Sequence, residues 1–83
     1  MELNSKYSTL KSKRNTVEKI MESFLRESNE MKERALEYKD RPGIRENYLA
    51  AAQHKINKAN ALQEAITAMD EKLDRILQEN QTK

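Results

Sequence analysis

The stretch Asp40-Arg41-Pro42-Gly43 decides the fold that this sequence predicts. A proline disfavours the helical conformation at the residue before it, and a glycine gives the backbone unusual freedom, so a long helix is expected to end here. The chain has one proline and one glycine among its 83 residues, and both lie in this stretch. The sequence therefore predicts a turn at residues 40–43 between two segments of nearly equal length.

Upstream of the turn, apolar residues recur every seven positions, the period of a helix that packs against another helix. The row consists of Leu3, Leu10, Val17, Phe24, Met31 and Tyr38. A second row, offset by four residues, holds Tyr7, Met21 and Ala35 and is interrupted by Arg14 and Ser28. These rows predict one helix over about residues 5–40, with Asn4 or Ser5 as its N-terminal cap.

An alternative reading breaks this helix at Ser28-Asn29, which would give three helices. Serine and asparagine favour helix caps over helix interiors, because their side chains compete for backbone hydrogen bonds. The apolar period nevertheless stays in phase from Phe24 to Met31, and a loop would usually lose that phase. One continuous helix is therefore the favoured interpretation.

Downstream of the turn the same period returns, which predicts a second helix over about residues 43–79. Its apolar positions are Ala59, Leu62, Ile66, Met69, Leu73 and Ile76. Nearer the turn the apolar positions shift to Leu49, Ala52 and Ile56, so the stripe is expected to drift around the helix. A short connection makes the helices antiparallel neighbours. The expected fold is an all-α, coiled-coil-like hairpin that forms a single domain over residues 1–83.

The charge distribution also favours an antiparallel arrangement. Residues 1–14 carry four basic and one acidic side chain, and residues 15–40 carry five and seven. Residues 41–60 carry four and one, and residues 61–83 carry three and five. The net charges of the four blocks are thus +3, −2, +3 and −2. Folding at the turn lays each basic block beside an acidic one.

Matching the two segments end to end places residue i opposite residue 84 − i. Arg14, the charged interruption of the apolar row, then falls opposite Asp70. The same register brings Lys55 and Lys58 close to Glu30 and Glu27, so these charges are expected to neutralise one another. Tyr38 and Tyr48 flank the turn and are expected to staple it; the alternative is an exposed binding pair.

The inventory of reactive side chains argues against an enzyme. The chain has no cysteine and a single histidine, His54, which lacks the Glu-x-x-His spacing of a di-iron helix bundle. One glycine cannot form a phosphate-binding loop. We therefore expect no catalytic residues, no metal, no cofactor and no small-molecule substrate. The sequence also lacks a long apolar run and a secretory leader, which predicts a cytoplasmic protein with no membrane partner.

Several large apolar residues exceed what a two-helix seam can bury, so a further helix is expected to cover them. Self-association of two hairpins into a dimeric four-helix bundle is the simplest solution, and a helix of a partner protein is the second. The residues expected at this protein interface are Ile20, Phe24, Leu25, Leu49, Ile56, Leu62 and Leu77.

The expected function is therefore that of a small adaptor, chaperone, scaffold or inhibitor. In size the hairpin is similar to small adaptor chaperones of bacterial secretion systems, to phage-encoded inhibitors and to WXG-type secreted hairpins. The turn Arg41-Pro42-Gly43 and the absence of tryptophan depart from the WXG signature, so this is a likeness of shape. The alternative is a nucleic-acid-binding helical dimer, in which Arg45, Lys55 and Lys58 contact phosphates.

Overall fold

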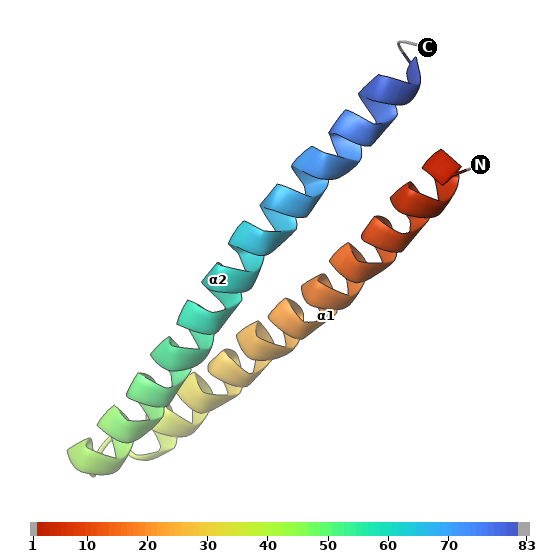
Figure 1. The fold of residues 1–83 in the computed structure, drawn as a ribbon. Coiled ribbons are helices and arrows are strands. Elements are labelled where there is room, and N and C mark those ends of the chain that lie inside the picture. The colour runs from red at the N-terminus through yellow and green to blue at the C-terminus, as the bar shows by residue number, and fades with distance from the viewer. Residues whose placement is uncertain (1, 82–83) are drawn as a thin grey trace.

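The computed structural model describes residues 2–81, and the side chains of residues 5–80. It contains two α-helices, α1 (Glu2–Glu37) and α2 (Pro42–Gln81). The helices run antiparallel beside each other, with both termini at one end of the molecule and the turn at the other (Figure 1). The hairpin extends over 65 × 15 × 12 Å. The predicted all-α hairpin is confirmed for the described residues.

The turn lies at residues 38–41, slightly earlier than expected. The Tyr38 amide donates to the Ala35 carbonyl at 3.2 Å, and the Arg41 amide donates to the Tyr38 carbonyl at 3.0 Å. Pro42 then occupies the first position of α2, where a helix does not need its missing N–H group. Gly43 lies inside α2 and has no positive φ, so the turn does not use the conformational freedom of glycine.

The N-terminal boundary also differs from the expectation. Helix α1 begins at Glu2, so Asn4 and Ser5 lie within the helix and do not cap it. The contact predicted between Tyr38 and Tyr48 at the other end is confirmed, and it is a stack: the ring centroids lie 5.6 Å apart at an interplanar angle of 16°. This contact joins the last turn of one helix to the start of the other.

The alternative break at Ser28-Asn29 is wrong, because α1 is continuous through both residues. Ser28 is 1% exposed, and its hydroxyl donates to the Ala52 carbonyl of α2 at 3.1 Å. The facing helix supplies an acceptor for this hydroxyl, so the serine can stay inside a helix without competing for the backbone of its own turn.

The expected drift of the apolar stripe along α2 is also wrong. The buried residues Ala52, Ala59, Ile66 and Leu73 follow one another at a strict seven-residue spacing. Leu49 is 43% exposed. Ile56 was expected on the seam, but Lys55 lies there in its place. A lysine can occupy such a position because its methylene stem packs against apolar neighbours while its ammonium group reaches a carboxylate.

The seam consists of two rows on each helix, and only one of them contains fully buried residues. The inner row is the heptad position at which all the fully buried residues lie. These residues are Ser28 and Ala35 of α1, and Ala52, Ala59, Ile66 and Leu73 of α2. The outer row lies three residues after each inner position and is half-buried throughout. It contains Leu10, Val17, Phe24, Met31 and Tyr38 of α1, and Tyr48, Lys55, Leu62, Met69 and Ile76 of α2.

This asymmetry follows from the sizes of the side chains. Four of the six buried residues, Ser28, Ala35, Ala52 and Ala59, are small and lie in the half of the hairpin nearer the turn, so the helices can approach closely there. The large side chains of the outer row stay half-buried and lie toward one side of the hairpin. The hairpin therefore buries a narrow core of small residues and leaves its bulkiest apolar residues half-exposed.

Candidate protein-interaction surfaces

Arg14 marks one long side of the hairpin, which we call the Arg14 side. Its Nε donates to Asp70 Oδ1 at 2.9 Å, and its Nη1 also contacts Glu18 on the next turn of α1. This confirms the pair predicted from the register. The hydrogen bond to Asp70 raises the pKa of Arg14 above its ordinary value. The arginine therefore stays charged at any pH used to study a protein.

Four of the seven residues expected at a protein interface lie on the Arg14 side. Leu25 is one heptad after Glu18 on α1. Leu49, Ile56 and Leu77 are spaced by multiples of seven from Asp70 on α2. Leu25, Leu49 and Leu77 are exposed and Ile56 is half-buried.

The opposite side, which we call the Phe24 side, carries the outer row. Lys55 Nζ lies 3.1 Å from Glu27 Oε2, and the ammonium groups of Lys55 and Lys58 lie 5.3 and 5.6 Å from the centroid of the Phe24 ring. The two lysines therefore interact with this ring as cation–π partners. The pairing expected from the register differs in detail: Lys55 meets Glu27 in place of Glu30, and Lys58 lies over Phe24.

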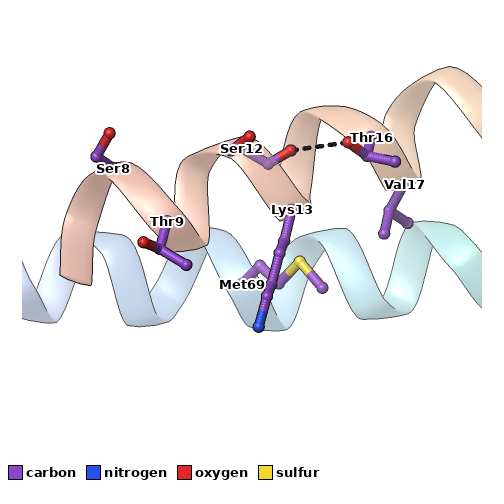
Figure 2. Close-up of a pocket in the computed structure, with 7 residues that line it drawn as sticks. All are labelled: Ser8, Thr9, Ser12, Lys13, Thr16, Val17 and Met69. Carbon is purple, nitrogen blue, oxygen red and sulfur yellow. Dashed lines mark hydrogen bonds between the residues drawn. The ribbon is translucent and has the colours of Figure 1, made fainter. Parts of the chain in front are cut away.

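Three shallow hollows lie along the Phe24 side, each between outer-row side chains. The largest, of about 610 Å³, has Val17 and Met69 between the helices, with Lys13 reaching across them (Figure 2). Hydroxyl side chains of α1 complete its wall: Ser8, Thr9, Ser12 and Thr16. The second hollow lies nearer the termini, over Leu10 and Ile76, and is lined by Lys6, Lys13 and Lys72. The third lies near the turn and is lined by Met31, Ile44, Asn47, Tyr48 and Ala51.

The remaining expected interface residues, Ile20, Phe24 and Leu62, lie on the Phe24 side. Phe24 and Leu62 belong to the outer row, and Ile20 is one heptad before Glu27. The seven residues thus lie on two opposite sides of the hairpin and do not form one surface. The sequence-based reasoning missed that Leu10, Val17, Met31, Met69 and Ile76 are surface residues of this side. The signal was present near the turn, because the inner-row residues of that half, Ser28, Ala35, Ala52 and Ala59, are all small.

The basic residues expected to bind nucleic acid do not gather into one patch. Lys55 and Lys58 are both engaged at Phe24, and Lys55 is also paired with Glu27. Arg45 precedes Lys55 by ten residues, which is about 15 Å along a helix axis. The geometry gives this alternative no specific support.

Carboxylates of α1 form the only other notable group on the described surface. Glu30, Glu33 and Glu37 line a shallow hollow together with Arg34. Among the described side chains of residues 5–80, no group of three or more histidine, aspartate and glutamate residues is arranged to hold a metal ion. His54 is exposed on α2.

Neither α1 nor α2, as far as the structure describes them, is long and apolar enough to cross a membrane. No model of a known protein family, no curated protein and no solved structure matches the chain. Its function has to be inferred from the two sides of the hairpin.

Proposed function

We propose that this hairpin is a non-enzymatic protein-interaction module that binds helical protein surfaces through its Phe24 side. It would serve as a small adaptor, chaperone, scaffold or inhibitor. One observation carries the proposal: all ten outer-row residues are half-exposed on this side, whereas the fully buried core consists of six residues, four of them alanine or serine.

Burial of apolar surface is the main source of folding free energy, at roughly 25 cal/mol per Å². A chain of this size already has an unfavourable ratio of surface to core, and here the largest apolar side chains contribute only part of their area. A further helix or pair of helices on the Phe24 side would complete the burial of the outer row. A four-helix bundle formed by two hairpins, or a groove occupied by a partner's helix, would both do so.

A matched pair of variants tests the choice of side. Ile20 and Leu25 are 45% and 40% exposed on α1, but they lie on the Phe24 side and the Arg14 side respectively. Ile20→Asp is expected to abolish association with a second copy or a partner helix, because it places a carboxylate at the centre of the interface. Leu25→Asp should leave association intact. Sedimentation velocity measures both, and circular dichroism checks that each variant remains helical.

The proposal fails if neither substitution affects association, or if Leu25→Asp has the larger effect. The nucleic-acid alternative predicts a different outcome of the sedimentation experiment. A monomer that sediments with a short RNA or DNA at low salt, and releases it at high salt, would replace the protein-interaction role with polyanion binding.

A further inference from the structure

We propose that the partner of the Phe24 side is an acidic amphipathic helix of another protein, which lies over the half of this side nearer the termini. The helix places large apolar side chains in the first and second hollows and carboxylates against the lysines around them. This assignment rests on the proposed function, because it names the chemistry of the partner for the same surface.

The first and second hollows, which we call the basic hollows, are lined by lysines and by no described carboxylate. Lys13 lines both of them, and its side chain reaches from α1 toward Met69 of α2 (Figure 2). Lys6 and Lys72 line the second hollow. All three lysines are exposed, and none forms an ion pair with a described carboxylate. Their ammonium groups are therefore available to the carboxylates of another molecule.

The wider surface around the basic hollows is also positively charged. The flanking positions lie one residue before and three residues after each outer-row residue. Over residues 5–20 and 62–80 the cations at these positions are Lys6, Lys13, Lys72 and Arg75, and Glu79 is the one carboxylate. Four positive charges against one negative charge leave an excess of three, which favours an acidic partner.

The half of the Phe24 side nearer the turn has no such excess. Its cations are Arg34, Lys55 and Lys58, and its carboxylates are Glu27, Glu30 and Glu37. Lys55 and Glu27 moreover pair with each other within the hairpin. A second copy of this chain therefore offers no acidic excess on this side to match the basic hollows, and a different protein fits them better.

The spacing of the basic hollows favours a helix over an extended peptide. Leu10 and Val17 line them on α1, and Ile76 and Met69 line them on α2, so the apolar residues are seven positions apart in each helix. Seven residues span about 10.5 Å along a helix axis. A helix laid along the hairpin repeats its side chains at this interval, whereas one face of an extended strand repeats them about every 6.8 Å. A helix with apolar residues seven positions apart therefore fits both hollows at once.

Nucleic acid and lipid fit the basic hollows less well. No described aromatic side chain lines either hollow, so nucleic-acid bases would have nothing to stack on. The apolar lining residues are half-buried between exposed lysines. A flat lipid surface would meet those lysines first, whereas the protruding side chains of a helix can enter the hollows.

Synthetic peptides test the chemistry of the partner on the intact hairpin. The acidic peptide has leucine at the two core positions of each heptad and glutamate at the flanking positions, and the basic peptide has lysine in place of glutamate. About 21 residues span about 32 Å as a helix, which is half of the 65 Å hairpin. Repulsion between like charges keeps each peptide from pairing with itself. We expect the acidic peptide to bind at least about tenfold more tightly than the basic one. Added salt should narrow the difference, and fluorescence anisotropy of labelled peptides measures both effects.

A matched pair of variants places the contact on the hairpin. Lys13→Glu changes the lysine that lines both basic hollows, and it should weaken binding of the acidic peptide about tenfold. Lys32→Glu makes the same change in net charge at an exposed position one heptad after Leu25, on the Arg14 side, and should leave binding nearly unchanged. Circular dichroism checks that both variants remain helical. Equal weakening by both variants, or a basic peptide that binds as tightly as the acidic one, overturns the acidic partner.

Further outcomes separate this assignment from the proposed function. A hairpin that binds neither peptide but associates with a second copy through Ile20 overturns the acidic partner and leaves the proposed function standing. An acidic peptide with alanine in place of every leucine keeps its charge but loses its apolar anchors. If that peptide binds as tightly as the leucine version, or if a short RNA replaces it with strong salt dependence, the surface is a site for polyanions and both proposals fail.

Discussion

Arg14 of α1 and Asp70 of α2 are joined across the hairpin by a 2.9 Å hydrogen bond between two residues that are 56 positions apart in the sequence. Arg14 interrupts the apolar inner row, and it is half-buried there because Asp70 and Glu18 both accept from its guanidinium group. The pair supports this register of the helices, since a shift of one heptad would put Gln63 or Leu77 in the place of Asp70.

Replacing this carboxylate should destabilise the fold more than replacing a nearby one. Asp70→Leu removes the acceptor on α2 and leaves Arg14 with Glu18 alone. Asp74→Leu, one turn further along α2, removes an exposed carboxylate and serves as the matched control. We expect a lower melting temperature for Asp70→Leu when both variants are compared at one protein concentration. Equal melting temperatures would show that the pair does not fix the register.

The closeness of the helices along the inner row can be tested by adding volume. Ala59 is 2% exposed, whereas Ala61 on the same helix is exposed to solvent. Ala59→Leu should destabilise the hairpin by about 1–3 kcal/mol, because a well-packed contact cannot accept added methylene groups without strain. Ala61→Leu should change stability by no more than about 0.5 kcal/mol. Urea unfolding of both variants measures the difference, and equal stabilities would contradict close packing at Ala59.

Gly43 should be replaceable with a gain in stability. It lies in the first turn of α2 without a positive φ, and an added Cβ would meet nothing within 4 Å. Gly43→Ala is expected to stabilise the protein by about 0.5–1 kcal/mol, because alanine loses less backbone entropy on entering a helix. Ala50→Gly, at an exposed position of α2, should cost a similar amount and provides the control. A loss of stability in Gly43→Ala would mean that the turn does require glycine.

The outline of the hairpin was predictable from the sequence because it depends on strong and local signals. Pro42 marks the break between the helices and starts the second one, and the seven-residue period identifies the faces that meet. The pairing of Arg14 with Asp70 followed from length and charge alone. These features need no knowledge of how closely the helices approach each other.

The candidate interaction surface was harder to predict because it depends on that distance. Leu49 and Ile56 look like better seam residues than Lys55 when hydrophobicity alone is counted. Alanines at 52 and 59 change the outcome, since they let the helices come close and fix the heptad phase in which Lys55 takes the seam. The same close approach moves Phe24 and Met69 toward one side of the hairpin. No local pattern in the sequence predicts how much of these side chains is exposed.

Lys55 provides a direct test of this view of the seam. Its ammonium group pairs with Glu27 and lies over Phe24, but both charged side chains remain partly exposed, so the ion pair should contribute only about 0–1 kcal/mol. Lys55→Met keeps the length and the apolar stem of the side chain, and it should leave the free energy of unfolding within about 1 kcal/mol of the original.

Lys55→Glu puts a second carboxylate beside Glu27 and removes the cation from the Phe24 ring, so it should be clearly less stable than Lys55→Met. Added salt should narrow that gap, because it screens the repulsion between exposed carboxylates. Urea unfolding at low and high ionic strength measures both effects, and a methionine variant as unstable as the glutamate variant would mean that the charge at Lys55, not its stem, holds this layer of the hairpin together.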